Sequence, residues 1–527
     1  LTVNGTFTFT TPVAFNGSYA VTVGTQPIGQ TCTVSSGGGS MVAGNITQVA
    51  ITCSVAMYNV SVNVTGLNPG QSVNFNNVTT LASDPLTVTS NGVNSFGRMV
   101  QYGGSYHINI SSQPVGISPQ QICSLENSGE GQINSNFTAV VSCRNRAAYI
   151  VNNGDATISQ FNVNSNGSLS NIEGAGPTVP LGTSGANQVV IHPSGKYVYV
   201  TDNLHSSILI FSANQNGSLN YINSITPSTY TGSSTTVMAI SPAGDIAYVA
   251  TGGSATSWQF LLQFMINADG SLTQIGAYTF TGFKSDKPGI NQLSVDGSNL
   301  YANSPTTSTV YMFKLPGNQH IQPGFPIPIS VTLPTYQGSW AVQPYAISAY
   351  SSAINDTHYL AVSGFSSGCT SQFCTYTNYT EYVYLFDTNA YPAPTVIWKN
   401  SPRYTTFPGW SSYPSPSTAV AVGPGGNVYY AESSLSEYTN GLPIGAVIYT
   451  LPVNTTTPTA QVVSAFRGGG TNEPKAMTID PLGQWAYVLY NYGAGNGGIL
   501  TKMNTSGAVP DLISRGTGNL PTSFAIW

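Results

Sequence analysis

Apolar and polar positions between Asn187 and Leu219 follow the pattern of a small antiparallel sheet. Runs at Val189 to Ile191, Tyr197 to Thr201 and Ile208 to Phe211 predict three strands, and a Gly turn before Leu219 introduces a fourth. A single four-stranded sheet cannot bury both of its faces. The pattern therefore predicts further copies of the same unit elsewhere in the chain.

These copies are present on both sides of the first unit. The same plan begins again near Thr235, Gly289, Gln343, Ser417 and Glu473. The block from Ala147 to Leu169 has the second and third strands but no first strand, and Pro521 to Trp527 has the pattern of the missing one. Because the end of the chain completes its beginning, we predict a closed ring. Residues 147–527 are expected to form a seven-bladed β-propeller in an all-β protein.

The first 146 residues contain two copies of a smaller unit. The order of matching residues is the same in both copies, namely Gly17-Ser18-Tyr19, Gln26-Pro27, Cys32 and Cys53 in the first and Gly104-Ser105-Tyr106, Gln113-Pro114, Cys123 and Cys143 in the second. Alternating runs at Thr6 to Thr10, Ser18 to Val23 and Gln48 to Cys53 predict small β-sandwiches, which resemble Ig-like modules. We assign residues 1–55 to the first module and residues 56–146 to the second.

The two copies differ at their start. The second copy has Met57 to Pro85 ahead of its matching Leu86, including the strand-like run Tyr58 to Val64, whereas the first has nothing ahead of Leu1. The first module is therefore expected to lack its opening strands and to expose part of its core. An uncaptured upstream segment, a cleaved segment or a strand from a neighbouring molecule could account for this. The last arrangement would build a fibre.

The units of the ring also resemble a known family. The runs HPSGKYVYV, SPAGDIAYV and DPLGQWAYV, together with the hairpins Asn164 to Leu169, Asn214 to Leu219 and Asn267 to Leu272, resemble the seven-bladed lactonase-type propellers, which include 6-phosphogluconolactonase-like proteins. The resemblance covers Ala147 to Trp527. It implies acid, base and anion-binding side chains at the mouth of the central channel, at the start of each blade's first strand.

In this chain those strand starts are almost entirely neutral. They read Asn187-Gln188, Thr235-Thr236, Asn291-Gln292, Gln343, Ser417-Thr418, Glu473 with Lys475, and Thr522-Ser523. General acid–base catalysis needs positioned titratable groups, so Glu473 and Lys475 are the catalytic candidates. The five histidines lie in turns or unrelated contexts: His107, His192, His205, His320 and His358. We predict no metal site and no cofactor.

Charge and hydropathy limit the classes of partner. Charged residues make up only 6% of the chain, against about 25% in an average protein. The 18 acidic and 13 basic residues give a net charge of −5 and form no basic stripe, so nucleic acid is not expected as a partner. The most apolar run, Phe260 to Ile266, has the length of a strand, which predicts no membrane span.

All six cysteines can pair locally. Cys32 with Cys53, Cys123 with Cys143, and Cys369 with Cys374 leave no cysteine over, which indicates disulfides and an oxidising compartment. A zinc site at Cys369 and Cys374 would need further ligands, and no histidine is close in sequence. We therefore expect an extracellular or cell-surface location.

Fourteen N-x-S/T sequons could carry glycans if the host glycosylates them. They could equally follow from a composition rich in Asn, Ser and Thr. The asparagines are Asn4, Asn16, Asn45, Asn59, Asn63, Asn77, Asn109, Asn136, Asn166, Asn216, Asn355, Asn378, Asn454 and Asn504.

The insertion from Trp398 to Pro416 is rich in aromatic residues and Pro. Its Trp398, Tyr404, Phe407, Trp410 and Tyr413 could stack on sugars, bury into a partner, or pack down a long loop.

These features together predict a non-enzymatic extracellular surface or appendage protein. It would act by contact with other protein chains, including copies of itself, or with glycans. One form of this function is a filament subunit joined by strand complementation at the incomplete first module. The alternative is a lactonase-like hydrolase with an atypical active site.

Overall fold

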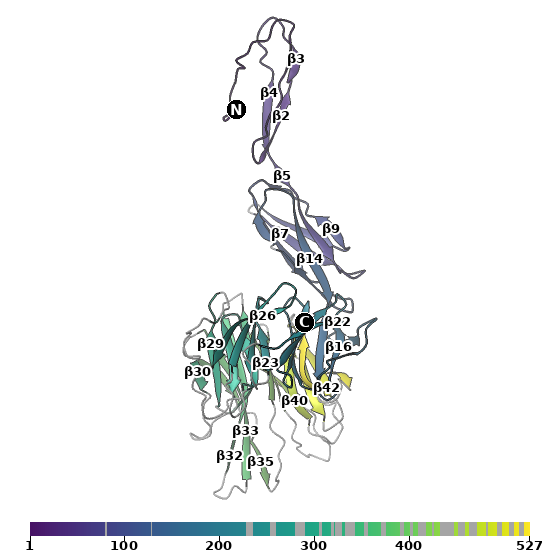
Figure 1. The fold of residues 1–527 in the computed structure, drawn as a ribbon, viewed down its shortest axis with the longest axis vertical. Coiled ribbons are helices and arrows are strands. Elements are labelled where there is room, and N and C mark those ends of the chain that lie inside the picture. The colour runs from purple at the N-terminus through teal and green to yellow at the C-terminus, as the bar shows by residue number, and fades with distance from the viewer. Residues whose placement is uncertain are drawn as a thin grey trace. The chain divides into compact units, whose positions relative to one another are not determined.

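The computed structural model describes the following residues: 1–79, 82–127, 129–227, 235–252, 260–279, 290–304, 308–317, 321, 329–332, 343–352, 357–369, 376–389, 395–400, 404–408, 418–423, 426–432, 447–451, 459–462, 472–480, 483–492, 498–504, 511–515 and 521–527. Within these ranges every regular element is a β-strand, so the predicted all-β class is confirmed. The chain divides into two compact units (Figure 1). Unit 1 holds 1–115 and 121–143, and unit 2 holds 116–120 and 144–527.

Unit 2 is the predicted seven-bladed propeller, each blade a sheet of at least four strands. In order from the inner strand outward, the first blade is β44 (Pro521–Ile526), β15 (Ala147–Asn152), β16 (Thr157–Val163) and β17 (Leu169–Asn171), with β18 (Thr178–Pro180) also paired with β16. The second blade is β19 (Ala186–Ile191), β20 (Tyr197–Asp202), β21 (Ser207–Ala213) and β22 (Leu219–Ile225). The third blade is β23 (Thr235–Ile240), β24 (Ile246–Thr251), β25 (Phe260–Ile266) and β26 (Leu272–Thr279).

The last four blades follow the same order. They are β27 (Gln292–Val295), β28 (Asn299–Ser304), β29 (Thr309–Lys314) and β30 (Ile329–Thr332); β31 (Gln343–Ser352), β32 (Thr357–Cys369), β33 (Tyr376–Asp387) and β34 (Thr395–Asn400), with β35 (Tyr404–Pro408) on β33; β36 (Thr418–Val422), β37 (Val428–Glu432), β38 (Val447–Leu451) and β39 (Thr459–Val462); and β40 (Asn472–Ile479), β41 (Trp485–Tyr492), β42 (Gly498–Asn504) and β43 (Asp511–Arg515).

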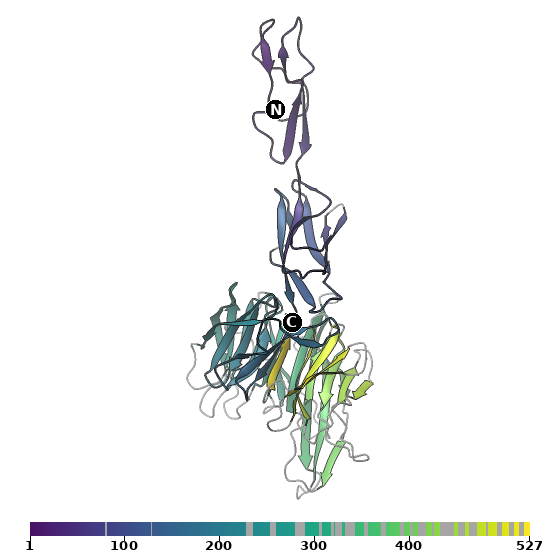
Figure 2. The ribbon, with the colours of Figure 1, turned by 90° about the vertical axis from the view of Figure 1, so that its right-hand side faces the viewer.

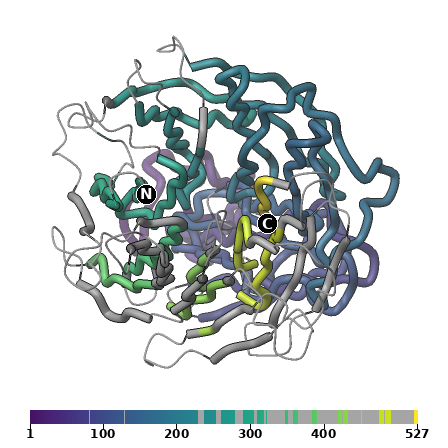
Figure 3. The backbone as a smooth tube through the Cα atoms, turned by 90° about the horizontal axis from the view of Figure 1, so that it is seen from below, coloured from purple at the N-terminus to yellow at the C-terminus, as the bar shows by residue number. Residues whose placement is uncertain are grey.

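The ring closes as the sequence predicts. β44 pairs antiparallel with β15, with Phe524 opposite Ile150, and the Trp527 amide donates to the Ala147 carbonyl at 3.0 Å. In Figure 3 the ring runs from blue through teal and green to yellow, and its first and last segments meet. The C-terminal strand is therefore the innermost strand of the first blade.

The propeller core lies between neighbouring blades. One cluster joins Tyr149 of the first blade to Val189 of the second, and another joins Tyr487 of the seventh to Ile150 of the first. Further clusters join the second blade to the third, the third to the fourth, the fourth to the fifth and the fifth to the sixth. At these six junctions the sheets bury their faces against one another, as the repeat required.

The fifth blade has the longest strands of the propeller. β32 has 13 residues and β33 has 12, and their far ends extend beyond the other blades (Figures 1 and 2). β35 pairs with β33 from Tyr404↔Thr380 to Pro408↔Tyr376. The aromatic insertion is therefore part strand, contrary to its interpretation as a long loop, because the extended hairpin offers it an edge.

Unit 1 contains a complete sandwich in its second half. Its two sheets have the orders β13-β11-β7-β8 and β12-β14-β6-β9, and its core includes Val62, Phe75 and Val141. The strands are β6 (Val60–Thr65), β7 (Val73–Val78), β8 (Ser83–Val88), β9 (Gly92–Ser95), β11 (Ser105–Ser112), β12 (Gln121–Leu125), β13 (Glu130–Gln132) and β14 (Phe137–Asn145), with β5 (Met57–Tyr58) and β10 (Val100–Gln101) as a separate pair.

The first module is much less regular. It contains two strand pairs, β1 (Ser18–Ala20) with β3 (Gly38–Ser40) and β2 (Gln30–Ser35) with β4 (Ala50–Val55). The strand expected at Thr6 to Thr10 does not form, and the one expected at Ser18 to Val23 ends at Ala20. Alternation alone was a poor guide there, because a strand also needs a hydrogen-bonding partner.

Candidate functional site

The inner strands bring the predicted channel residues to the axis, where three of them hold neighbouring blades together. Gln188 Oε1 accepts from the Met238 amide at 2.6 Å, and Gln292 Oε1 accepts from the Ile347 amide at 2.8 Å. Ser523 Oγ accepts from the Val189 amide at 3.2 Å. The side-chain oxygen of each residue thus accepts a hydrogen bond from a backbone N–H group of the next blade.

Two further serines on inner strands make the same kind of contact. Ser294 Oγ accepts from the Ala349 amide at 2.9 Å, and Ser348 Oγ accepts from the Val422 amide at 3.1 Å. Sequence reasoning missed both because they follow the strand starts by a few residues. Five polar side chains of the inner strands, among those that the structure describes, thus connect neighbouring blades.

The two catalytic candidates lie on the inner strand of the seventh blade. Glu473 and Lys475 both belong to β40, and Lys475 is half-buried. The side chain of Glu473 lies outside the described part of the structure. Among the residues described, no group of three or more His, Cys, Asp or Glu side chains is placed to hold a metal ion.

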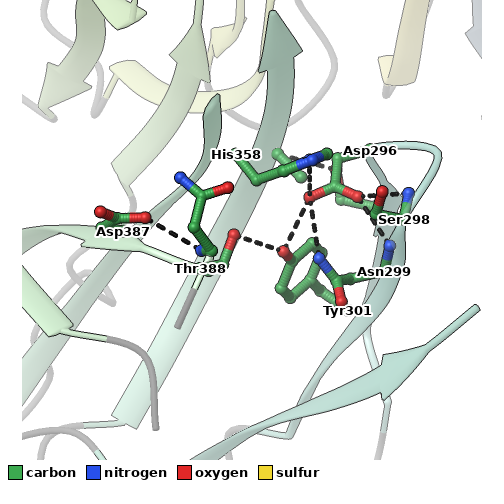
Figure 4. A network of polar contacts seen from close by, with 10 residues as sticks. Asp296, Ser298, Asn299, Tyr301, His358, Asp387 and Thr388 are labelled. Carbon is green, nitrogen blue, oxygen red and sulfur yellow. Dashed lines mark hydrogen bonds and ion pairs between the residues drawn. The ribbon is translucent and has the colours of Figure 1, made fainter. Parts of the chain in front are cut away.

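A cluster of titratable groups joins the fourth and fifth blades (Figure 4). Asp296 follows β27 in a tight turn, and its Oδ1 accepts from the amides of Ser298 at 2.8 Å and Asn299 at 2.7 Å. Its Oδ2 accepts from the Tyr301 hydroxyl at 2.8 Å and lies 3.3 Å from His358 Nδ1. The carboxylate has no exposed surface, and His358 is only 12% exposed.

This cluster is arranged to hold structure rather than to bind a substrate. The Tyr301 hydroxyl also lies 2.9 Å from that of Thr388, whose amide donates to the His358 carbonyl at 3.0 Å. Burial and the adjacent Asp296 carboxylate raise the pKa of Tyr301 far above its usual value, so the phenol stays protonated as a donor. The fold brings His358 and Tyr301 to the same carboxylate oxygen of Asp296, although sequence analysis had linked His358 to no other residue.

Other blades carry the same tyrosine at the third position of their second strand. Tyr149 donates to the Gly217 carbonyl at 2.6 Å, Tyr199 to Gly270 at 2.9 Å and Tyr487 to Gly167 at 3.0 Å. Each acceptor lies in a turn of the next blade. The tyrosines of KYVYV and QWAYV are Tyr199 and Tyr487, so this repeated position is the sequence signal for the contact, and sequence analysis did not assign it a role.

Two of the three predicted disulfides are present. Cys32–Cys53 and Cys123–Cys143 lie at matching positions of the two modules, with Cα atoms 4.0 and 3.9 Å apart. The predicted bond between Cys369 and Cys374 lies outside the described residues.

The sequon asparagines differ in accessibility. Asn77 is fully buried and its Oδ1 accepts from the His107 amide at 3.2 Å, so the folded module does not present this side chain to a glycan. Asn63 is half-buried. Eight others are exposed: Asn4, Asn16, Asn45, Asn59, Asn109, Asn136, Asn166 and Asn216. The side chains of Asn355, Asn378, Asn454 and Asn504 are not among those described.

The aromatic segment is only partly described. Trp398 lies on β34, and Tyr404 and Phe407 lie on β35. The side chains of these three, and Trp410 and Tyr413 entirely, fall outside the described residues. The geometry that would decide between sugar stacking and packing is therefore not part of the described structure.

With this architecture established, comparison with known proteins shows which propellers the ring resembles. Residues 129–255 match a family model described as lactonase, 7-bladed beta-propeller. The resemblance to lactonase-type propellers is confirmed. The match spans the end of the second module and the first blades of the ring, where the sequence repeats are most regular.

The solved structures that match this chain are remote in sequence. The periplasmic gluconolactonase of Pseudomonas aeruginosa is 14% identical, with a TM-score of 0.48 over 72% of this chain and 98% of its own. A putative 6-phosphogluconolactonase of Bacteroides fragilis is 13% identical, with a TM-score of 0.45 over 73% and 98%. A functionally unknown protein of Desulfotomaculum acetoxidans is 12% identical, with a TM-score of 0.43 over 72% and 98%. No curated protein matches the sequence significantly.

Proposed function

We propose that this lactonase-type propeller is a non-enzymatic extracellular surface or appendage protein, which acts by contact with other proteins or with glycans. The observation that carries the proposal is the use of the axial polar side chains. Gln188, Gln292 and Ser523 lie where lactonase-type enzymes would place acid and base groups. Each of them instead accepts a hydrogen bond from a backbone amide of the next blade. Neutral side chains engaged in this way do not perform general acid–base catalysis.

The disulfides and the exposed sequons support a location outside the cell. The disulfides Cys32–Cys53 and Cys123–Cys143 are typical of oxidising compartments. In the described residues no helix is long and apolar enough to cross a bilayer. Exposed sequons such as Asn109 and Asn166 are compatible with a glycosylated surface.

The first module supports a role in assembly. Its apolar residues Val3, Phe9 and Ile28 are 69%, 74% and 86% exposed. Surface of this kind in a small β module favours a partner chain, and a subunit that receives a strand from its neighbour can form a filament.

Lactone hydrolysis tests the proposal against its alternative, a hydrolase with an atypical site at Glu473 and Lys475. The purified chain is mixed with glucono-δ-lactone and, separately, with 6-phosphogluconolactone, and ring opening is followed by proton release. We expect the spontaneous rate. Hydrolysis above that rate that is lost in Glu473→Gln and kept in Glu173→Gln, an exposed glutamate of the first blade, would overturn the proposal.

A further inference from the structure

The residue that follows the inner strand of a blade supports the turn into the second strand. Asp296 Oδ1, Asp480 Oδ1 and Ser241 Oγ each accept from the backbone amide that opens the second strand of their blade, at 2.7, 2.7 and 3.1 Å. In the second blade the residue at this position is His192. Its acceptor is a ring nitrogen, since His192 Nδ1 accepts from the Ser194 amide at 3.1 Å. An imidazole nitrogen, unlike a hydroxyl, ceases to accept hydrogen bonds when it is protonated near neutral pH.

The contacts of His192 fix its protonation state. Nε2 lies 2.7 Å from the Gly244 carbonyl, which can only accept, so Nε2 carries a proton. Nδ1 faces the Ser194 amide, which can only donate, so Nδ1 keeps its lone pair. Ser194 Oγ also lies 2.7 Å from Nδ1. The imidazole is therefore neutral. A proton added at Nδ1 could be accepted by the turned hydroxyl, but the Ser194 amide would lose its acceptor.

The turn that His192 supports also receives the last strand of the ring. The Pro193 carbonyl accepts from Trp527 Nε1 at 2.8 Å, and the indole packs on Gly195. The Gly195 amide in turn donates to the His192 carbonyl at 2.8 Å. The imidazole and the closing tryptophan thus depend on one turn, Pro193 to Gly195.

His192 itself lies between the second and third blades. Its ring packs on Gly244, where φ is +80° and a Cβ atom would lie 2.7 Å from the imidazole. The ring also meets Tyr197 edge to face, with centroids 6.0 Å apart. The side chain is half-buried, so a charge on it would lose part of its hydration.

The surroundings of His192 disfavour a charged imidazole. Burial lowers its pKa, and the Lys196 charge lowers it further, whereas the hydrogen bond to the Gly244 carbonyl opposes both effects. Trp527, which approaches from the first blade, has no titratable side chain. Oδ1 of the Asp245 carboxylate accepts from Ser241 Oγ at 2.7 Å. The titratable side chains of the second and third blades around this contact are Lys196, Tyr197, Asp245 and Asp269.

We propose that His192 is an acid-sensitive latch on the closure of the ring. In its neutral form it holds the Pro193 to Gly195 turn against Trp527, and on protonation it releases that turn. The proposal concerns the fold and is separate from the proposed function.

The direction of the effect follows from linkage. A histidine in the unfolded chain titrates near pH 6.5, and the folded chain lowers the pKa of His192. The stabilisation by the neutral ring is therefore fully present above about pH 6.5. It is lost as the pH falls through that value towards the lowered pKa of the folded chain.

Amide hydrogen exchange of the full chain, followed by mass spectrometry, tests the latch in residues 192–197 and 521–527. Rates at pH 7.5 and pH 5.0 are each corrected for the chemical exchange rate at that pH. We expect protection of both segments to fall at least about fivefold on acidification. In His192→Asn, whose side-chain oxygen accepts at both pH values, it should fall less than about twofold. Equal falls in the two proteins, or no fall in the unmodified chain, would overturn the proposal.

His205→Asn is the matched control in the same blade. His205 Nδ1 lies 2.8 Å from Asp202 Oδ2, and its side chain is 59% exposed. We expect this variant to keep the fall in protection of the unmodified chain. Loss of that fall here as well would assign the acid response to another group.

A second measurement needs no variant. Hydrogen exchange at the imidazole C2 atom, followed by mass spectrometry, gives the titration curve of His192 in the unmodified chain. We expect its midpoint to coincide with that of the fall in amide protection. A separation of more than about one pH unit would contradict the latch, whether or not His192→Asn folds.

Discussion

At the scale of single residues, the side chain of Arg146 is held by three partners in the propeller. Its guanidinium is fully buried and lies 3.0 Å from the Asp480 carboxylate, with Nη1 donating to Gln120 Oε1 at 2.7 Å and Nε to the Trp527 carbonyl at 3.1 Å. Burial lowers the pKa of Arg146, and the Asp480 charge opposes that shift. One side chain thus connects the last blade, the C-terminus and the start of the ring.

Removal of this guanidinium should destabilise the propeller. Arg146→Ala leaves the Asp480 carboxylate buried without its cation, which costs about 3–5 kcal/mol. Chemical denaturation of the ring measures the loss, and Glu173→Ala, at an exposed charged residue of the first blade, should change stability by less than about 0.5 kcal/mol. The double variant Arg146→Met with Asp480→Leu should be less destabilised than Arg146→Ala. A loss below about 1 kcal/mol in Arg146→Ala would contradict the role assigned to the pair.

At the scale of elements, strands in this protein form only where a partner edge exists. Thr6 to Thr10 alternates as a strand should but remains irregular, whereas Pro521 to Ile526 forms β44 because β15 offers it an edge. Trp527 adds a contact with the second blade, since its Nε1 donates to the Pro193 carbonyl at 2.8 Å. The indole ring of Trp527 packs on Gly195. The backbone of Gly195 has a φ of +68°, and a Cβ atom at this position would lie 2.3 Å from the indole, so the contact requires glycine.

Deletion of residues 521–527 should therefore open the ring. The first blade would lose its innermost strand, and buried Phe524 and Trp527 would no longer cover the adjoining blades. We expect the thermal midpoint of the ring to fall by more than about 10 °C, in line with the loss of several kcal/mol. Addition of the peptide Pro521 to Trp527 should restore part of it, and a scrambled heptapeptide should not. An unchanged midpoint in the truncated chain would argue against closure by β44.

At the scale of the whole molecule, buried tyrosines are distributed around the ring. Burial raises the pKa of Tyr149, Tyr199, Tyr248, Tyr301 and Tyr487 well above the usual value. In the unfolded chain the same phenols ionise near pH 10. The folded state therefore retains protons that the unfolded state has lost once the pH passes that value.

Stability should accordingly fall as the pH rises above about 10. The contribution of these tyrosines to the free energy of unfolding is fully present below the pKa that their phenols have in the unfolded chain. It is lost as the pH rises from that value towards the raised pKa of the same phenols in the folded chain. Urea denaturation at pH 8, 9, 10 and 11 measures the fall, and absorbance near 295 nm counts the phenolates. Equal unfolding free energies at pH 8 and pH 11 would rule out this linkage. Replacement of the exposed Tyr221 by Phe should leave the profile unchanged.

Local sequence pattern determined the all-β class, the seven blades and the closure of the ring, because each depends on alternation and turns that repeat along the chain. It also paired Cys32 with Cys53 and Cys123 with Cys143, since each pair is close in sequence and duplicated. Only the tertiary structure joined Arg146 to Asp480 and His358 to Asp296. These partners are separated by 334 and 62 positions, and no local pattern encodes a contact between side chains on different blades. The same holds for Thr6 to Thr10, whose own residues favour a strand while the absence of a neighbouring edge prevents it.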